Sequence, residues 1–403
     1  MSLPPETPFV VFGDDWGRYP STIQHTFRHI ALRHPVVWVN GLGHRVPRLN
    51  LTDARRAWEK VRRLAGRRRV PDRSAVGTVG AAAPLGGGVP AAIIDPKVLP
   101  WHNLGFVHRI NTHSLVRAIN AQLLALGLDL PPVLVTGSPP SVGVLGRLDE
   151  LTSIYYVLDD FLNFPTYTAS MLAPLERDLL DRVDAVVATA ASLTETKRPR
   201  SGRTFHLPQG VNYDHFARQM PEPEDLSQIP RPRIGLAGTL STQCDLEILA
   251  RLAVEFPDAS LVIVGPVAFG DEELQSLRRP NVHILGVRPY SGLPAYVQHF
   301  DVGIIPYVIS GWTVAVDPLK LLEYLAAGLP VVTTAIPEAA KYAGTVSVAD
   351  SADKFVEAVR DALSRGRRDQ AQGRAIAQAN RWERRADSFL DIVSRVIADR
   401  NSL

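Results

Sequence analysis

Two series of short apolar segments, separated by stretches with helical spacing, constrain the fold of this chain most strongly. The first series comprises Pro8–Gly13, Val36–Asn40, Pro132–Gly137, Ser153–Asp160 and Asp184–Thr189, and the second comprises Arg231–Gly238, Ala259–Pro266, Asn281–Gly286, Asp301–Tyr307 and Leu329–Thr334. Most are rich in β-branched residues and are bounded by Gly or Pro. Continuous apolar strands that alternate with amphipathic helices are typical of parallel sheets covered on both faces. The sequence therefore predicts an α/β protein with two doubly wound domains.

The domain boundaries are predicted from length and composition. A chain of 403 residues suits two domains better than one. The segment ARQMPEPEDLSQIPRP between the two series is rich in Pro and acidic residues and has a poor apolar pattern, which is typical of a linker. We expect an amino-terminal Rossmann-like domain at residues 1–216, a linker at 217–231 and a carboxyl-terminal Rossmann-like domain at 232–380. Residues 381–403 have the pattern of one long helix, which we expect to pack back on the first domain.

Composition and charge exclude several classes of function. The formal net charge is only +3, so no whole-protein field favours nucleic acid as a partner. The single Cys244 excludes a disulfide framework and a cysteine-based zinc site, and the histidines lack the spacing of metal ligands. The amino terminus lacks the pattern of a signal peptide, and no apolar stretch is long enough to cross a bilayer. We therefore expect a soluble cytoplasmic protein without a bound metal or cofactor.

One segment, residues 55–73, is densely basic. A solvated helix and loop in an Arg-rich chain would account for it. Alternatively, the segment forms a patch that touches anionic lipid headgroups, where each cation near the surface contributes about 1 kcal/mol. That interpretation would suit a peripheral protein at the inner face of the plasma membrane. Nucleic-acid binding is the weaker interpretation, because aromatic residues are sparse in this segment.

An unusual charge pattern lies in VDPLKLLEYLAAGLPVVTT, which spans Val316 to Thr334. Asp317 suits the N-cap of a helix and Pro318 suits its first position, which places Lys320 in the first turn. The helix dipole disfavours a cation there by about 0.3–1 kcal/mol, and a bound anion would reverse the sign. Glu323, three positions further on, could accept the two hydroxyls of a ribose. The pattern thus fits a nucleoside diphosphate along the helix, and the alternative is an exposed Lys–Glu pair worth a few tenths of a kcal/mol.

Several segments, in this order along the chain, resemble GT-B glycosyltransferases. DPLKLLEYLAAGLPVVTT resembles the nucleotide-sugar signature of the family 4 group, which has a glycosyltransferase 1 domain. PRIGLAGTLSTQCDLEILARLAVEFPDASLVIVGPV and NVHILGVRPYSGLPAYVQHFDVGIIPY resemble the rest of its donor domain, and HLPQGVNYDHFA resembles the junction between its domains. IYYVLDDFLNFP and GDDWGRYPSTIQHTFRHIA resemble the first domain of the branch that includes teichuronic-acid-type transferases.

The resemblance implies a GT-B fold with two facing Rossmann-like domains and a carboxyl-terminal helix. It also implies a hexosyltransferase that moves a sugar from a nucleoside-diphosphate-sugar donor to a polysaccharide or lipid-linked acceptor, without a protein-bound metal. The donor-binding residues that it implies are Gly238, Thr239, Gly286, Val287, Tyr307, Asp317, Lys320, Leu321 and Glu323. The acceptor-side residues are Gly13, Asp14, Asp15, Trp16, Asp159 and Asp160. Asp15 and Lys320 are the predicted catalytic residues.

The sequence departs from the family pattern at two places. Many members have two glutamates with seven residues between them; Glu323 corresponds to the second, and Ala315 stands at the position of the first. The loop GTLSTQCD lacks the usual Arg and Lys of the family. These departures would fit a non-catalytic sugar-binding relative. The same architecture also hosts nucleotide-sugar 2-epimerases, which would depend on a carboxylate and histidine set that the sequence does not reveal.

Overall fold

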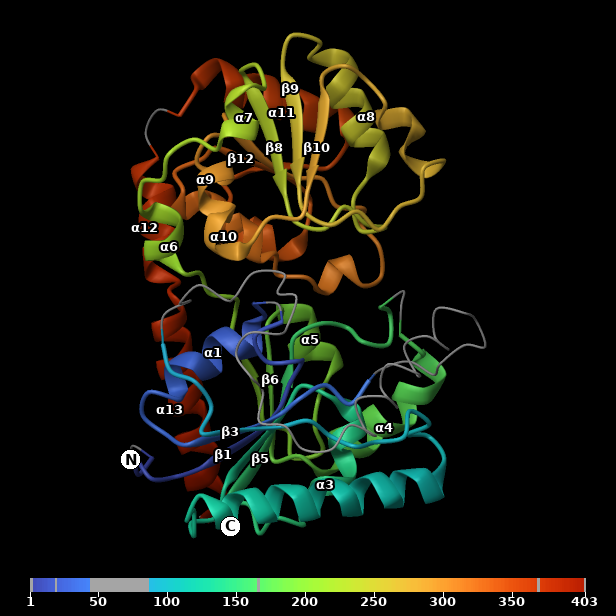
Figure 1. The fold of residues 1–403 in the computed structure, drawn as a ribbon, viewed down its shortest axis with the longest axis vertical. Coiled ribbons are helices and arrows are strands. Elements are labelled where there is room, and N and C mark those ends of the chain that lie inside the picture. The colour runs from blue at the N-terminus through green and yellow to red at the C-terminus, as the bar shows by residue number, and fades with distance from the viewer. Residues whose placement is uncertain (1–2, 19, 44–86, 165–166, 368–369, 402–403) are drawn as a thin grey trace.

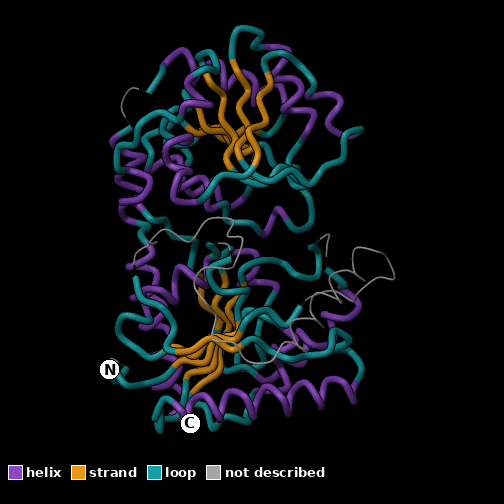
Figure 2. Tube along the Cα trace, in the orientation of Figure 1, coloured by secondary structure: helices purple, strands orange, loops and turns teal. Residues whose placement is uncertain are grey.

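In the computed structural model, which describes residues 3–18, 20–43, 87–164, 167–367 and 370–401, the chain forms two α/β domains joined along the long axis of the molecule (Figure 1). Each domain has a parallel sheet at its centre with helices around it (Figure 2). The predicted fold class is therefore confirmed. The basic segment at residues 55–73 lies outside the described residues.

The first sheet has seven strands in the order β3-β2-β1-β4-β5-β6-β7. They are β1 (Phe9–Phe12), β2 (Val36–Val39), β3 (Ala92–Ile94), β4 (Val133–Thr136), β5 (Thr152–Val157), β6 (Ala185–Ala188) and β7 (Thr204–His206). All neighbours are parallel, and β1 lies between β2 and β4, with Phe9 opposite both Val36 and Val133. Because all strands point the same way, the loops that follow them share one edge of the sheet.

Helices cover both faces of the first sheet. One face carries α3 (Gly105–Ala125), η1 (Pro139–Val144) and α4 (Ala169–Arg182), and the other carries α1 (Thr22–Ile30) and α13 (Trp382–Asn401). α1 starts where the sequence predicts, because the Ser21 side chain accepts a hydrogen bond from the Gln24 amide. α13 runs beside α1, and the ring of Phe389 packs edge-on against that of Phe27 with centroids 5.5 Å apart, a distance typical of such pairs. The carboxyl-terminal helix is thus part of the first hydrophobic core.

The second sheet has six parallel strands in the order β10-β9-β8-β11-β12-β13. They are β8 (Arg233–Ala237), β9 (Ser260–Val264), β10 (Val282–Gly286), β11 (Val302–Ile305), β12 (Val331–Thr334) and β13 (Ser347–Ala349). The helices of this domain are α6 (Tyr213–Ala217), α7 (Glu224–Ser227), α8 (Leu246–Glu255), α9 (Leu293–Val297), α10 (Leu319–Ala326), α11 (Ala352–Arg365) and α12 (Ala371–Ala379). Short 3-10 turns are η2 (Glu273–Leu277), η3 (Tyr290–Gly292), η4 (Thr313–Ala315) and η5 (Pro337–Tyr342).

The chain crosses between the domains twice, and the two crossings lie side by side. Val211 on the first crossing forms a β-bridge with Arg381 on the second, and its amide donates to the Asn380 carbonyl over 2.9 Å. An added Cβ at Gly210 would lie 2.6 Å from the Trp382 ring, so only glycine permits this close approach. Val211 already belongs to the second core, as do several residues of the segment read as a linker from its composition.

Among the described residues, none of the helices is both long and apolar enough to cross a membrane.

Candidate functional site

Lys320 is the central charged group at the junction of the domains. It lies in the first turn of α10, on the side of the second domain that faces the first (Figure 1), and only 9% of its surface is exposed. Its ammonium lies 4.9 Å from the centre of the Tyr307 ring. An added Cβ at Gly238 would lie 2.7 Å from Lys320 Nζ, so the loop after β8 reaches the ammonium with its backbone. Gly238 has φ +136°, which side-chain-bearing residues rarely adopt.

The charge on Lys320 has no carboxylate partner among the described residues. Burial acts to lower the pKa of Lys320, but the phenols of Tyr307 and Tyr324 and the thiol of Cys244 raise it above its ordinary value. The group is therefore a buried cation at the positive end of a helix. An exposed Lys–Glu pair, the alternative considered from the sequence, is wrong. A buried cation at this end of a helix is a group of the kind that binds anions, because the helix dipole acts in the same direction.

Glu323 lies one turn further along α10 and is half-buried. Burial raises the pKa of its carboxyl to about 7, while the ammonium of Lys320 acts to lower it. Its carboxylate has no hydrogen-bond partner within the described part of the chain. Burial and the charge of Glu323 together raise the pKa of Tyr290, which places Glu323 near the loop that follows β10. That loop begins at Gly286, with φ +73°, and continues with the exposed Val287.

Asp317 does not cap α10, so the N-cap predicted from the sequence is wrong. The helix begins after Pro318, and no side chain caps it. The Asp317 carboxylate instead accepts a hydrogen bond from the Gln209 amide over 2.9 Å and lies 3.1 Å from Lys341 Nζ. Partners from elsewhere in the chain thus take the place of the amides of α10. Leu321 offers no free group to a ligand, because its side chain lies in the second core and its amide donates to the Pro318 carbonyl.

The loop after β1 presents two carboxylates with different surroundings. Asp14 accepts hydrogen bonds from Ser21 Oγ over 2.9 Å and from Gln24 Nε2 over 3.0 Å, which fixes it beside the start of α1. Burial raises the pKa of Asp14 above its ordinary value, and these hydrogen bonds act to lower it. Both residues lie at the surface, and Asp15 forms an ion pair with Arg18 over 3.2 Å. Asp14 is therefore the carboxylate of this loop that side-chain hydrogen bonds from Ser21 and Gln24 hold in place.

Gly13 and Trp16 shape the same loop rather than offering reactive groups. The Trp16 ring packs edge-on against Trp38 with ring centroids 4.7 Å apart. An added Cβ at Gly13 would lie 2.2 Å from the Trp38 ring, and Trp38 Nε1 donates to the Asp14 carbonyl. A side chain at Gly13 would push Trp38 out of place and move the loop.

Asp159 and Asp160 follow β5 at the same edge of the sheet. Asp160 is held by Lys197, whose ammonium lies 3.0 Å from it and 2.8 Å from Glu176. Tyr155 on β5 donates to the other oxygen of Glu176 over 2.8 Å. This buried network fixes the loop. Asp160 was predicted as an acceptor-side residue, whereas Lys197, Glu176 and Tyr155 were not predicted, because they are far apart in sequence and no local spacing pairs them.

Asp159 is the carboxylate of this loop that stays without a hydrogen bond or ion pair within the described residues. Burial raises its pKa to about 7, and the neighbouring charge of Asp160 acts in the same direction. Burial raises the pKa of Tyr307, the ammonium of Lys320 lowers it, and the charge of Asp159 raises it again. A carboxylate of the first domain and the ammonium of the second therefore act on the same phenol. The structure brings Asp159 and Lys320 to one junction.

Other contacts hold the two domains together around this junction. The rings of Phe164 and Trp312 lie 5.0 Å apart, on loops that follow β5 and β11. Ala315, which stands at the position of the family's first glutamate, is 5% exposed and packs in a hydrophobic cluster of the first domain. The loop after β11 is thus docked on the opposite domain. A methyl group at that position supplies no hydrogen bond to a sugar.

A polar contact across the domains was also missed from the sequence. Glu338 on η5 accepts a hydrogen bond from the Ala191 amide at the start of α5 (Ala191–Thr196) over 2.6 Å. Lys341 lies 3.1 Å from both Glu338 and Asp317. Ala191 and Glu338 are 147 positions apart, so no spacing in the sequence predicts this contact. Within the described ranges, no group of three or more His, Cys, Asp or Glu side chains is arranged to hold a metal ion.

Comparisons with known proteins agree with this architecture. Residues 231–365 match the family model described as glycosyl transferases group 1. A protein named as a teichuronic acid biosynthesis glycosyltransferase, TuaH of Bacillus subtilis (strain 168), is 32% identical over 183 residues, which cover 43% of this chain and 46% of TuaH. The match thus spans about half the length of that relative. The resemblance to the glycosyltransferase 1 group and to the teichuronic-acid-type branch is confirmed.

Solved structures with the same fold cover nearly the whole chain. Anabaena Alr3699/HepE, solved in complex with UDP and glucose, has a TM-score of 0.63 at 12% identity and covers 96% of this chain and 99% of its own. Sucrose-phosphate synthase from Thermosynechococcus elongatus has a TM-score of 0.64 at 15% identity and covers 98% of this chain and 100% of its own. At these identities the likeness concerns the fold, and that fold is GT-B.

Proposed function

We propose that this chain is a glycosyltransferase that moves a sugar from a nucleoside-diphosphate-sugar donor to a glycan or lipid-linked acceptor of the cell envelope. The match of residues 231–365 to glycosyl transferases group 1 and the name of the TuaH relative support this proposal. UDP in the related HepE structure supports a nucleotide donor. The observation that carries the proposal is the buried ammonium of Lys320 at the amino end of α10, without a carboxylate partner in the described chain.

The donor lies along α10 in this proposal. Lys320, the first-turn amides and the Gly238–Thr239 backbone bind the diphosphate. Glu323 accepts the ribose hydroxyls, and the Gly286–Val287 backbone lies beside the base, since Glu323 acts on Tyr290 in that loop. Negative charge develops on the leaving diphosphate as its bond to the anomeric carbon breaks. Lys320 and the helix end stabilise that charge, because they are fixed in place before the reaction.

The acceptor lies on the first domain, at the loops after β1 and β5. We assign the proton of the acceptor hydroxyl to Asp159, since its carboxyl has a pKa of about 7 and no hydrogen bond in the described structure. The acceptor oxygen forms a bond to the anomeric carbon while the bond from that carbon to the diphosphate breaks. Asp14, which Ser21 and Gln24 hold in place, positions the acceptor. The exposed Asp15, predicted as catalytic from the family, takes no part in this scheme.

A sugar-binding relative without catalysis is the second candidate function. The observation that favours it is Ala315, which is buried against the first domain and offers no group to the sugar. The loop after Gly238 also lacks a cation. In that case Lys320 and Glu323 would still bind a nucleotide, but no bond would be made. The two candidates therefore share a binding site and differ in turnover.

Radiolabelled nucleotide sugars separate these functions. We expect the native protein to transfer label to an acceptor glycan, or to hydrolyse one donor slowly, and Lys320→Met to lose both. Binding of a donor without transfer or hydrolysis would favour the sugar-binding relative. Release of a free epimerised sugar would favour the 2-epimerase reaction instead. Absence of binding to every nucleotide tested would contradict the proposed function as a whole.

A further inference from the structure

The long helix α3 is apolar on two opposite sides. Its inward side packs in the first core, through Val107, Leu115, Ile119 and Leu123. Its outward side carries Phe106, Ile110 and Leu124, which are 66%, 55% and 78% exposed. An ordinary surface helix has one apolar face and one polar face. α3 therefore presents exposed apolar side chains near both ends of one face, with Arg117 between them, and nothing in the described chain covers them.

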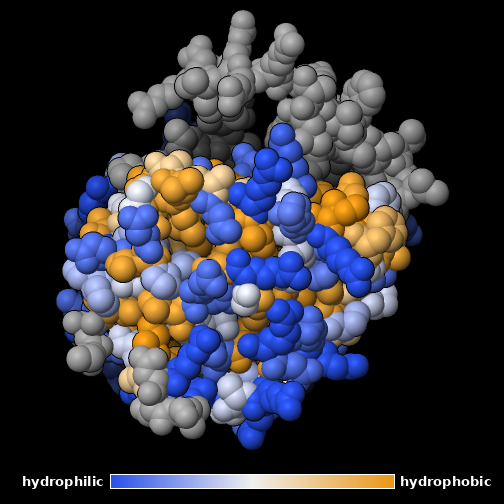
Figure 3. All heavy atoms as spheres, turned by 90° about the horizontal axis from the view of Figure 1, so that it is seen from below, coloured by the Kyte–Doolittle hydropathy of each residue, from blue (hydrophilic) through white to orange (hydrophobic). Residues whose placement is uncertain are grey.

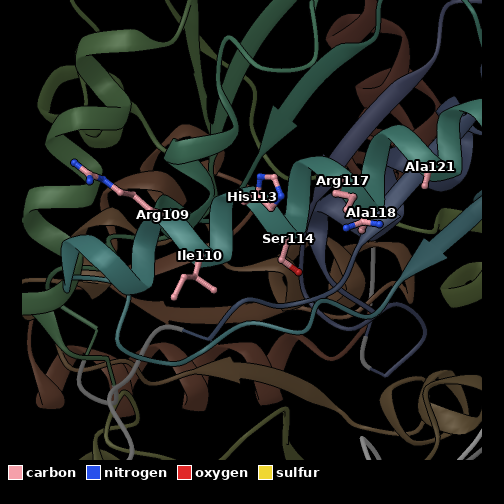
Figure 4. A pocket seen from close by; sticks show the side chains of 7 residues that line it. All are labelled: Arg109, Ile110, His113, Ser114, Arg117, Ala118 and Ala121. Atoms are coloured by element: carbon pink, nitrogen blue, oxygen red, sulfur yellow. The ribbon is translucent and has the colours of Figure 1, made fainter.

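The exposed apolar surface continues into the segment before the helix. Trp101 and Leu104 are 43% and 42% exposed. A hollow of about 720 Å³ lies along α3 between Arg109 and Ala121, and those of its lining residues that the structure describes all come from this helix (Figure 4). On the side of the molecule where α3 lies, hydrophobic surface alternates with hydrophilic side chains (Figure 3). Exposed aromatic and aliphatic side chains beside arginines are the groups that bind at the interface of a bilayer.

The charge of this surface has one sign. From Pro96 to Leu128 the chain has no Asp or Glu, and its charged residues are Lys97, Arg109 and Arg117. Arg109 and Arg117 are exposed beside Ile110. A second copy of the chain docked here about a twofold axis would set these cations against themselves. An anionic surface complements them.

We propose that the outward face of α3, together with Trp101 and Leu104, docks on an anionic lipid bilayer. The topology of the first domain places this contact near the proposed acceptor side. α3 follows β3 and returns to the start of β4, so its amino end lies toward the edge of the sheet that carries Asp14 and Asp159. Docking by this end keeps the acceptor side near the headgroups. The inference extends the proposed transfer to a lipid-linked acceptor, but lipid binding itself requires no turnover.

Cosedimentation of the full-length protein with lipid vesicles tests this inference. We expect the protein to sediment with vesicles of phosphatidylglycerol and phosphatidylcholine at low salt, and to stay in solution with phosphatidylcholine alone. The double variant Phe106→Ser/Ile110→Ser should lower the affinity about tenfold, since it removes the inserted apolar groups. Arg109→Gln/Arg117→Gln should also weaken binding and reduce its dependence on salt.

The control variant changes the same residue types on the second domain. Val254, which is 51% exposed, is replaced by Ser, and Arg278, which has an exposed ion pair, is replaced by Gln. This variant should sediment like the native protein. UDP affinity, measured by calorimetry, should be native in every variant, which shows that each one folds. That second readout also separates failure of the lipid contact from failure of the donor site.

Three results would overturn the inference. The first is that the native protein does not sediment with phosphatidylglycerol vesicles at low salt. The second is that Phe106→Ser/Ile110→Ser binds these vesicles as the native protein does. If the second result is found, loss of binding on changing Arg55 and Arg69 to Glu would locate the lipid contact in the basic segment. The third result is a dimer of the native protein in sedimentation velocity that Phe106→Ser/Ile110→Ser dissociates, with no lipid binding by either, because the face would then cover a second copy.

Discussion

Replacing Lys320 with Met separates the role of this residue in binding from its role in stability. Met has a similar length and fills the same space beside Tyr307 without a charge. In the ligand-free protein, the ammonium is buried at the positive end of α10 and has no described carboxylate partner. Its removal relieves a dipole penalty of about 0.3–1 kcal/mol and the cost of burying the charge, but it also removes the favourable interactions with Tyr307, Tyr324 and Cys244 that raise the pKa of Lys320. Because these effects oppose each other, we expect the free variant to be about as stable as the native protein.

The expected loss of binding follows from the contact that the ammonium makes with a diphosphate. A hydrogen bond to a charged group contributes about 1.5–3 kcal/mol, which weakens the Kd for UDP by about 10- to 150-fold. At a UDP concentration of about 100 times the native Kd, the ligand stabilises the native protein by about 2.7 kcal/mol. With a Kd that is about 100-fold weaker, the same concentration stabilises the variant by only about 0.4 kcal/mol.

Thermal unfolding with and without UDP measures both effects in one experiment. Lys354→Met is the matched control, because Lys354 is exposed on α11 and forms an ion pair with Asp350 over 2.7 Å. That exposed pair contributes at most about 1 kcal/mol, so the control should keep its response to UDP. The reasoning would be refuted if Lys320→Met lowered the stability of the free protein by several kcal/mol and left the UDP-induced shift intact. Lys320 would then be a structural group of the second core.

Three further substitutions test the other groups of the site. Because Glu323 has a pKa of about 7 in the folded protein and 4.5 ordinarily, it carries a proton below pH 7 and accepts fewer ribose hydroxyls. Measured by calorimetry, the UDP affinity of the native protein should fall from pH 8 to 6 more steeply than the affinity of Glu323→Gln. The stability of the native protein should fall relative to Glu323→Gln as pH rises from about 4.5 through 7, since the folded protein holds the extra proton. Parallel curves for the two proteins would remove Glu323 from the site. Asp159→Asn should lower kcat about 10²- to 10⁴-fold in the transfer assay and leave UDP affinity unchanged, and unchanged kcat would exclude it as the base. Gly238→Ala should weaken UDP binding and lower the Tm, because φ is +136° and the added Cβ meets Lys320 Nζ; the control Gly366→Ala, with φ +64° and open space around it, should lower the Tm alone.

The fold could be predicted from the sequence where strands are buried on both faces. β1, β4, β8 and β11 are continuous apolar runs because helices cover both of their faces, and each was found. The strands that were missed, β3, β7 and β13, have three residues each and lie at the edges of the sheets. Their side chains are partly exposed, so they lack the apolar run that marks a central strand.

The candidate site was predictable where one segment carries several of its groups. Lys320 and Glu323 lie on one short helix, and their spacing together with the family resemblance predicts that they share one ligand. The role of Asp317 was wrong because the competing partners, Gln209 and Lys341, come from elsewhere in the chain. No local pattern encodes such tertiary hydrogen bonds.

The burial of Ala315 against the opposite domain could also not be predicted from the sequence. A small apolar residue in a loop fits many surroundings, and only the docking of the two domains decides which one it has. The same holds for Glu338, whose partner Ala191 lies on the other domain.

A crystal structure of the protein with bound UDP shows where the diphosphate lies. We expect both phosphates at the amino end of α10, with an oxygen within hydrogen-bond distance of Lys320 Nζ and the ribose hydroxyls on Glu323. A nucleotide bound away from α10, or a diphosphate at this helix end that leaves Lys320 without contact, would contradict the proposed donor site.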